Sequence, residues 1–512
     1  MHATPDGIPL GLSRLIQHAT ISQVVTSVVL VLVVRWVVRG VQRVYFHPLS
    51  RFPGPKFAAA TRIPQLVAIW TGTNHTHVCK LHEKYGNIVR TAPDELSFVH
   101  PDAWRDIHGH GLKGTAGSPP PKNFTRYGNT VNGKPSMIIA SDGEHQRQRR
   151  IFTPAFSDRA LKQQEPLFLK YINLLVQKLK EGSQENPNHA FNMVDMYTFT
   201  TFDVMGDLTF GEPLQMLANT EYHPWVSIVF DSVKMGSRFA LMFYYPMLRK
   251  VWEAFVPESF AKKRFEHFQH SVNRVTKRLE KGRESEGVDL WTLVLKQHEG
   301  KGLSRDEMDS NAALFMIAGT ETTATIASGL TYLLVKNPEC MRKVVQEIRS
   351  IPNEDDMHLE SLAALPYLNA CIKEAFRIYP PVSIGLPHLT PPQGSTIAGE
   401  FIPPGWSVTV PQLAMYTSSR NFKEPHDFIP ERWMGDERFA SDQRAAVQPF
   451  SVGSRDCLGK NMAYHELRLI MAKVLYNFDI ELRPESDNWI DRQRVFNLWE
   501  KPPLLCKLKP VH

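Results

Sequence analysis

The longest run of hydrophobic positions lies near the N-terminus, where residues 21–38 are almost entirely apolar. A helix over these residues would be about 27 Å long, close to the hydrocarbon thickness of a membrane. Arg35 lies near one end of the run, where its side chain can extend to the headgroups, and Trp36 suits the membrane interface. The pattern predicts one transmembrane helix.

The charges on either side of this run predict its orientation. Only Arg14 and one acid, Asp6, precede it, whereas Arg39, Arg43, Arg51, Lys56 and Arg62 follow it. This asymmetry places the C-terminal bulk of the chain in the cytosol. A cleaved signal peptide is the alternative, but the apolar run starts late and no small-residue cleavage site follows it. We therefore expect a retained anchor.

A stiff bend separates the predicted anchor from the rest of the chain. Pro53 and Pro55 flank Gly54, and two prolines so close together cannot continue a helix. No Gly/Ser linker, low-complexity block or internal repeat interrupts the sequence after this point. The prediction is a lumenal tail at 1–20, an anchor at 21–38, a basic, proline-rich hinge at 39–56 and one large domain at 57–512.

A second pattern predicts a long helix in the middle of the chain. Ser304 and Glu307 form a capping-box sequence, and apolar residues then recur at helical spacing until Asn337 and Pro338. Such a helix would be about 50 Å long. Its middle is poor in helix formers, since Gly319 is followed by threonines at positions 320, 322, 323 and 325. A poor sequence inside a strong helix indicates function; the alternative is that the threonines hydrogen-bond to their own i−4 carbonyls.

Two further helices carry charged residues on one face. Glu374 and Arg377 are three residues apart on a helix predicted over 362–378. Another predicted helix begins at a capping-box sequence, Ser141 to Glu144, and carries His145 and Arg149 at i,i+4. Arg147 and Arg150 point elsewhere on that helix; either they form a solvated basic face or they dock an acidic partner.

Charge and cysteine usage exclude several classes of protein. The formal net charge of +7 is spread along the 512 residues, without the concentrated basic face of a nucleic-acid-binding protein. The five cysteines are unclustered, so neither a disulfide framework nor a zinc site is indicated, and reduced surroundings fit best. The glycosylation sequons at Asn74 and Asn123 would then face the wrong compartment.

The residues around Cys457 are the most informative part of the chain. The cysteine stands between Gly453 and Gly459, two residues after Arg455 and seven after Phe450, and a helix-like stretch follows. The glycines allow a sharp turn close to a flat cofactor, and the N–H groups of the turn and of the helix N-terminus favour a thiolate. A buried structural cysteine is the alternative for an isolated thiol. The full pattern favours an axial haem ligand, with Arg455 beside a propionate and Phe450 shielding the sulfur.

This loop resembles the cysteine-loop signature of the cytochrome P450 family, and three further motifs agree with it in the right order. They are the Glu-x-x-Arg pair Glu374 and Arg377, the segment Phe428 to Trp433 containing Arg432, and the oxygen-binding stretch Ala318 to Thr323. The resemblance implies a mainly α fold with a small β region. It also implies haem b with the Cys457 thiolate as its iron ligand.

The same resemblance implies roles for the other candidates. Glu321 and Thr322 would be the acid–alcohol pair that supplies protons for O–O cleavage, and Gly319 would open space for dioxygen. His145, Arg149 and His388 would contact the haem propionates; where the family often has Trp, this chain has His145. Glu374, Arg377 and Arg432 would form a buried structural triad whose disruption releases the haem.

The resemblance also implies partners and a location. It predicts electron supply from NADPH through a separate cytochrome P450 reductase, since the chain has no dinucleotide-binding fingerprint of its own. It predicts a monomeric protein held in the endoplasmic reticulum membrane by a single-pass anchor, with the catalytic domain in the cytosol. The sequence of the hinge looks most like that of fungal members of the family that act in secondary metabolism.

The substrate is predicted only by class. The segments that match substrate-contacting regions of the family are largely apolar, which favours a lipophilic and mostly neutral molecule such as a polyketide, terpenoid or alkaloid intermediate. They are residues 114–137, 199–247, 382–386 and 495–498 and the helix near Phe315. Two alternatives to hydroxylation remain open: desaturation, ring closure or phenol coupling without retained oxygen, and a non-catalytic haem carrier or sensor.

Overall fold

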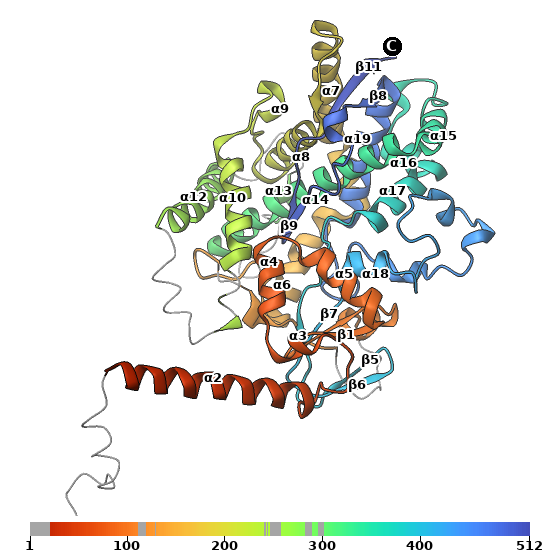
Figure 1. Cartoon of the computed structure of the whole chain (residues 1–512). Coiled ribbons are helices and arrows are strands. Elements are labelled where there is room, and N and C mark those ends of the chain that lie inside the picture. The colour runs from red at the N-terminus through yellow and green to blue at the C-terminus, as the bar shows by residue number, and fades with distance from the viewer. Residues whose placement is uncertain are drawn as a thin grey trace, which may run out of the picture.

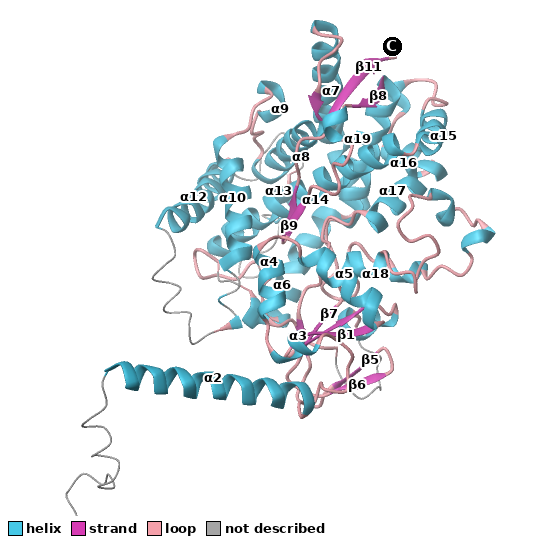
Figure 2. Cartoon of the chain, in the orientation of Figure 1, coloured by secondary structure: helices cyan, strands magenta, loops and turns pink. Residues whose placement is uncertain are grey.

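The computed structural model describes residues 21–110, 119–127, 130–239, 242, 244–245, 258–281, 289–294 and 302–511. The predicted lumenal tail and parts of the predicted substrate segments, Phe243 among them, lie outside the described residues. Helices dominate the described part; short strands form small sheets toward its two ends, and strand β9 lies near its middle (Figure 1, Figure 2). This confirms the mainly α prediction.

The helices are named in chain order. In the N-terminal half they are α2 (Ile21–Tyr45), α3 (Lys56–Ala60), α4 (Ile63–Trp70), α5 (Asn74–Tyr85), α6 (Asp142–Phe152), α7 (Asp158–Glu185), α8 (Met193–Phe210), α9 (Met216–Asn219) and α10 (Pro224–Phe239). They continue as α12 (Glu258–Glu280), α13 (Leu290–Val294), α14 (Arg305–Lys336), α15 (Pro338–Ile348), α16 (Leu359–Ala363), α17 (Pro366–Ile378), α18 (Gln412–Tyr416) and α19 (Lys460–Asn477).

The strands form four small sheets. The largest has the order β1 (Ile88–Ala92), β2 (Glu95–Phe98), β7 (Ser407–Thr409) and β4 (His388–Leu389), in which β2 and β7 are parallel. The second has the order β3 (Phe191–Asn192), β11 (Leu505–Pro510) and β8 (Phe478–Leu482). Two hairpins complete the set: β5 (Ser395–Ile397) with β6 (Glu400–Ile402), and β9 (Arg494–Phe496) with β10 (Leu498–Glu500).

Helix α14 crosses the centre of the molecule and packs against α8, α12, α17 and α19 (Figure 1). Its second half is buried on every side, which explains why it lacks a polar face. The predicted capping box is present, because the Ser304 hydroxyl accepts from the Glu307 N–H and the Glu307 carboxylate accepts from the Ser304 N–H. The sequence prediction for this helix is confirmed.

Other predicted boundaries need correction. The helix predicted over 362–378 is two helices, α16 and α17, because Pro366 starts a new helix at its first position. Ser141 is the N-cap of α6, but its side chain makes no capping hydrogen bond. Helix α2 continues to Tyr45, so residues 39–45 of the predicted hinge are helical.

Helix α2 stands apart from the rest of the molecule. Its most apolar window has a mean hydropathy of 2.2, and none of its residues is buried (Figure 1). Helix α2 has apolar residues on all sides and no protein around them, as a membrane-spanning helix would. It is also long enough to cross a membrane. It meets the body only at its C-terminal end, where it packs against α3.

Candidate active site

Cys457 lies in a tight loop directly before α19. Its N–H donates to the carbonyl of Phe450 at 2.8 Å, which closes the loop. Gly453 has a φ of 85°, and a Cβ there would lie 1.9 Å from the carbonyl oxygen of His108, so only glycine fits. Gly459 is the N-cap of α19. Of the two glycines, Gly453 is required by the geometry of the turn, whereas Gly459 has an ordinary φ of −86° and room for a side chain.

The surroundings of the Cys457 thiol suit a ligand of a metal ion. Burial raises the pKa of the thiol, whereas the Gly459 backbone, Arg149 and Lys460 act in the opposite direction. The side chain is nevertheless accessible to solvent, so the sulfur faces a space inside the protein rather than a packed core. A thiol of raised pKa loses its proton when a metal ion binds it. This donor fits the thiolate-bound iron of a haem.

Two arginines flank the cysteine, but their contacts differ from the prediction. Arg149 donates from Nη1 to the Asp456 carbonyl at 2.6 Å and pairs with the Asp456 carboxylate. Arg455 pairs with Asp142 at 2.7 Å and donates to the carbonyl of Ala140. Both contacts of Arg149 are therefore with the cysteine loop. The buried Nη1 of Arg455 has no acceptor and is the guanidinium nitrogen available to an anion.

A cluster of basic and polar side chains surrounds Arg455. His108 and His388 lie with their rings 4.4 Å apart. Burial, together with nearby cations, lowers the pKa of His145 and of His388 to about 4 and that of Lys122 to about 7. The cluster consists of His108, Lys122, Tyr127, His145, His388 and Arg455.

This cluster fits a buried dianion. The His108 Nε2 atom, the Tyr127 hydroxyl and the Arg455 Nη1 atom are buried without hydrogen-bond partners. Buried donors without acceptors are costly and indicate a missing anionic partner. The two propionates of a haem meet this requirement. His108, Lys122 and Tyr127 were missed by the sequence reasoning, since no motif marks them.

The threonines in the middle of α14 make the local contacts that the alternative predicted. Thr320, Thr322 and Thr323 all hydrogen-bond to their i−4 carbonyls, with 2.7 Å between the Thr322 hydroxyl and the Ala318 carbonyl. A Cβ at Gly319 would lie 2.8 Å from the Met205 sulfur, so Gly319 lets α8 pack closely against α14.

The same helix still presents an open position. Ala318 is exposed and Thr322 is half-buried, although the neighbouring positions 320, 321 and 323 are buried. The packing of α14 against α19, the helix that follows Cys457, therefore leaves these two positions partly uncovered. A flat cofactor and its substrate would cover a surface of this kind.

Glu321, predicted to pass protons to the site, is buried. It is 2% exposed and forms a buried ion pair with Lys501, which follows β10. Lys501 also donates to the Thr325 hydroxyl at 2.9 Å, and the Glu321 Oε2 atom is buried without a partner. Lys501 is therefore the cation that holds the Glu321 carboxylate, and the sequence reasoning missed it.

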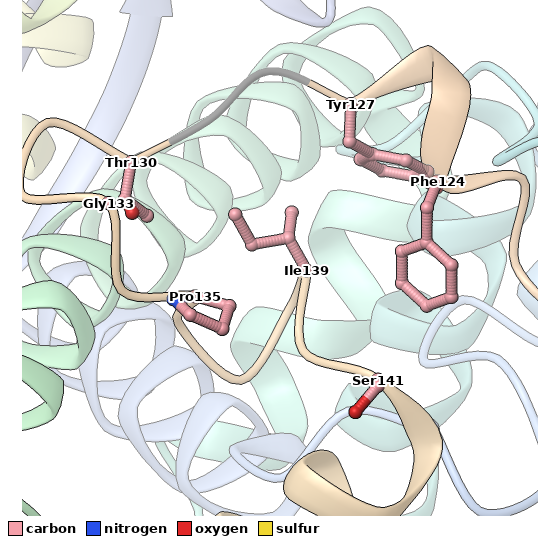
Figure 3. A pocket seen from close by; sticks show the side chains of 7 residues that line it. All are labelled: Phe124, Tyr127, Thr130, Gly133, Pro135, Ile139 and Ser141. Carbon is pink, nitrogen blue, oxygen red and sulfur yellow. The ribbon is translucent and has the colours of Figure 1, made fainter.

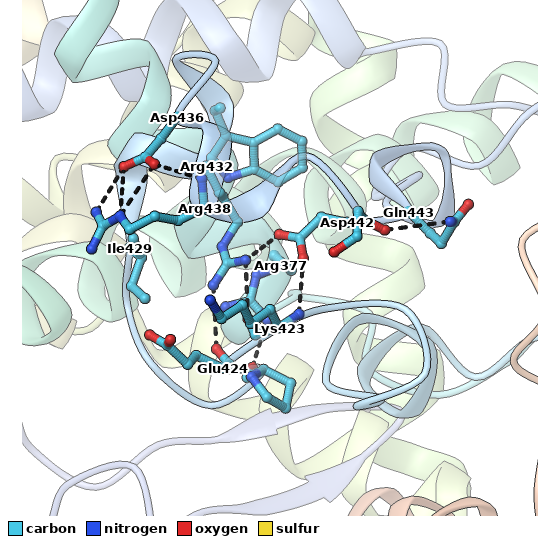
Figure 4. A network of polar contacts seen from close by, with 12 residues as sticks. Arg377, Lys423, Glu424, Ile429, Arg432, Asp436, Arg438, Asp442 and Gln443 are labelled. Carbon is cyan, nitrogen blue, oxygen red and sulfur yellow. Dashed lines mark hydrogen bonds and ion pairs between the residues drawn. The ribbon is translucent and has the colours of Figure 1, made fainter.

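The predicted triad is present as a fully buried ion-pair network. Figure 4 shows its two arginines, Arg377 and Arg432, with Asp442 beside Arg432. Glu374 lies 2.7 Å from Arg377 Nη2 and 2.9 Å from Arg432 Nε, and the Trp433 indole donates to it at 2.8 Å. Asp442 is a fourth member, paired with Arg432. All four charged side chains are inaccessible to solvent.

The network is connected to the cysteine loop by aromatic packing. Phe376, on the same helix as Glu374, lies 5.2 Å from the ring of Phe450, and Tyr464 lies against both. The contacts of Phe450 are with this aromatic cluster, and its carbonyl closes the cysteine loop.

One of the two arginines considered for a partner surface is already engaged. Arg147 donates to Glu144 at 2.8 Å and pairs with Glu307 at the start of α14. It holds α6 to α14, and this corrects the suggestion that it is free to dock a reductase. Arg150 is exposed.

A pocket of about 310 Å³ lies beside the basic cluster, within the segment predicted to contact substrate. Figure 3 shows the Ile139 side chain pointing into it opposite Tyr127. Its lining is mixed: the apolar side chains of Phe124, Pro135 and Ile139 lie beside the hydroxyl-bearing side chains of Tyr127, Thr130 and Ser141 and beside Gly133.

Glu466 on α19 makes the stability of this region pH-dependent. Burial raises the pKa of its carboxyl to about 8, against a smaller opposing effect of the Thr323 hydroxyl. Because the folded protein holds this proton more tightly than the unfolded chain, the stabilisation is complete below about pH 4.5 and is lost as pH rises toward 8. Glu466→Gln should therefore gain about 2 kcal/mol of unfolding free energy relative to wild type between pH 6 and pH 8.

This expectation is checked by denaturant unfolding in detergent at both pH values. Glu485→Gln, an exposed substitution after β8, is the control and should follow wild type. A Glu466→Gln protein that keeps a constant difference from wild type would contradict the prediction.

Comparison with known proteins agrees with this geometry. The family model described as Cytochrome P450 matches residues 53–507. The chain is 48% identical to the cytochrome P450 monooxygenase efuB of Hormonema carpetanum over 92% of this chain and 94% of the relative. It is 46% identical to the cytochrome P450 monooxygenase FUM2 of Gibberella moniliformis over 91% and 98%. It is 40% identical to a trichothecene C-4 hydroxylase of Trichoderma arundinaceum over 92% and 94%.

Proposed function

The chain belongs to the cytochrome P450 family, and from this premise we propose that it is a reductase-dependent monooxygenase that hydroxylates a lipophilic intermediate of fungal secondary metabolism. Membership establishes a haem monooxygenase that oxidises a small molecule. The observation that carries the finer proposal is the solvent-accessible Cys457 thiol together with three buried polar atoms that lack hydrogen-bond partners, His108 Nε2, the Tyr127 hydroxyl and Arg455 Nη1. Similarity to a trichothecene hydroxylase supports a neutral, lipophilic substrate.

Specific residues of this chain would hold the haem. Cys457 would be the axial ligand, and Arg455, His108, His145, His388 and Lys122 would meet the propionates, with Tyr127 as a further donor. When bound, the haem supplies dioxygen chemistry, and a thiolate ligand favours O–O cleavage. The Phe376, Phe450 and Tyr464 cluster would keep water from the loop on its proximal side.

Proton delivery would depend on α14. The Thr322 hydroxyl donates to the Ala318 carbonyl. It can rotate to donate instead toward the uncovered space beside it. Glu321 is one residue away, but its carboxylate is held by Lys501 and has no path to solvent of its own. We infer that a proton reaches Glu321 through Lys501 and Thr325, the polar groups in contact with it.

Replacing Lys501 with methionine should lower product formation about tenfold or more, because general acid–base steps contribute about 10²–10⁴ in rate. NADPH consumption should continue, with electrons released as hydrogen peroxide. The measurement is the ratio of product to NADPH at equal haem content. Lys336→Met removes a lysine paired with Asp487 on the surface and should leave this ratio unchanged. Unaltered coupling in Lys501→Met would exclude the relay.

The membrane and partner proposals rest on α2. We propose that α2 crosses the endoplasmic reticulum membrane once, with the domain that follows it in the cytosol. Its apolar, unburied length and the basic residues after it support this orientation. A cytosolic domain would receive electrons from an NADPH-dependent reductase in the same membrane.

The proposed activity is tested with isotope-labelled oxygen. The purified full chain is supplied with reductase, NADPH, ¹⁸O₂ and a lipophilic extract of its source, and masses are compared. A new product carrying one heavy oxygen is expected. A new unlabelled product would instead indicate desaturation, ring closure or coupling, and an extract left unchanged in the presence of active reductase would contradict the proposed substrate class.

A further inference from the structure

A second pocket lies where the anchor helix meets the body of the protein. Its volume is about 310 Å³, and it is formed by the end of α2, the hinge, the start of α3 and one residue of β1. The lining residues are Val44, Tyr45, Ser50, Arg51, Phe52, Pro53, Gly54, Lys56, Ala59 and Arg90. Three of them are cations and none is an acid.

Arg90 is the buried cation of this pocket. It is 1% exposed and donates only to backbone carbonyls, from Nη1 to Arg43 at 2.9 Å and from Nη2 to Pro93 at 2.6 Å. Its Nε is buried without an acceptor. Burial, reinforced by Arg43, lowers the pKa of Arg90 to about 10. Burying a guanidinium without a carboxylate partner is unfavourable, and a bound anion would offset this cost.

The other two cations reach the pocket from its exposed side. The Lys56 ammonium lies 5.5 Å from the centre of the Tyr45 ring. Arg51 lies 3.3 Å from Glu400 and also donates to the Phe401 carbonyl. Within the described part of the chain, no carboxylate lies at ion-pair distance from Lys56 or Arg90. The positive charge of the pocket is therefore largely uncompensated.

The location of the pocket points to one kind of anion. Tyr45 is the last residue of α2, whose other residues are apolar and unburied for most of its length. If α2 spans a bilayer, this end lies at the level of the headgroups, and Phe46 and Phe57 beside the pocket are exposed toward the same layer. Arg39 and Arg43, on the last turns of α2, add to the attraction for an anionic membrane surface.

We propose that this pocket binds the phosphate headgroup of an anionic phospholipid and so fixes the angle between the anchor and the domain. Lys56 and Arg51 hold the phosphate from the cytosolic side, and Arg90 lies beneath it. The acyl chains lie along the exposed apolar face of α2. Gly54 shapes the pocket, since a Cβ there would lie 2.5 Å from the Arg90 carbonyl oxygen.

The test is lipid binding by the full-length holoenzyme in detergent, followed by native mass spectrometry during titration with phosphatidylglycerol or phosphatidylcholine. Phosphatidylglycerol should bind more tightly. Lys56→Gln should weaken its binding about fivefold, the factor for one cation at an anionic membrane surface, and Lys56→Glu should weaken it further.

Lys84→Gln is the matched control, because Lys84 is an exposed lysine whose ammonium lies 5.4 Å from the ring of Tyr85, outside the pocket. It should bind phosphatidylglycerol like wild type. Equal binding of the two lipids, or equal weakening by Lys84→Gln and Lys56→Gln, would overturn the proposal. Displacement of phosphatidylglycerol by millimolar inorganic phosphate would overturn the lipid assignment in favour of a soluble anion. None of these readouts depends on monooxygenase activity.

Discussion

Replacing Glu374 with alanine should lower the free energy of unfolding by about 3–5 kcal/mol and cause loss of haem. The substitution leaves Arg377 and Arg432 buried and uncompensated, and removes the acceptor of the Trp433 indole and of the Ile429 N–H. Because α17 also carries Phe376 against Phe450, a displaced helix would disturb the cysteine loop. Denaturant unfolding in detergent and haem content per chain are the measurements.

The chain offers a closely matched control for this effect. Glu339 and Arg342 are also three residues apart on one helix, and their atoms lie 2.7 Å apart as in the Glu374–Arg377 pair. Their side chains are 64% and 62% exposed, whereas those of the buried pair are 0% exposed. Glu339→Ala should therefore leave the free energy of unfolding close to that of wild type. Similar costs for the two substitutions would show that burial does not make the Glu374 network essential.

The second large effect is expected at Cys457. Cys457→Ala should abolish product formation and the carbon monoxide difference band of thiolate-ligated haem, because alanine offers no ligand to iron. The fold should persist, since the loop is held by the Cys457 N–H bond to Phe450 and by Gly453, neither of which needs the sulfur. Circular dichroism with the carbon monoxide spectrum distinguishes loss of ligand from loss of fold.

Cys340→Ala serves as the control for this substitution. Cys340 is a half-buried thiol on α15, and its replacement should leave the spectrum intact. A Cys457→Ala protein that retains the thiolate-type band would refute the assignment of the iron ligand.

Local features of the fold could be predicted because their causes are local. The capping box at Ser304 joins residues three apart, the anchor is a continuous apolar run, and Gly453 before Cys457 constrains a single turn. The family and the mainly α fold followed from such short motifs, and the comparisons confirm both. The break between α16 and α17 at Ala364 to Pro366, which the predicted helix over 362–378 missed, also has a local cause. A proline at the first position of a helix marks the start of a new helix.

The sequence by itself determined the glycine-flanked cysteine loop, the long central helix, the spacing of Glu374 and Arg377 on one helix and the apolar N-terminal helix. Only the tertiary structure decided which distant residues complete each site. Lys501 meets Glu321 across 180 residues, and Arg90 meets the end of α2 across 47. His108 and His388 come together in the same way. Helical periodicity and capping act over three or four residues, so they carry no information about such pairs, whose contact is set by the packing of whole elements.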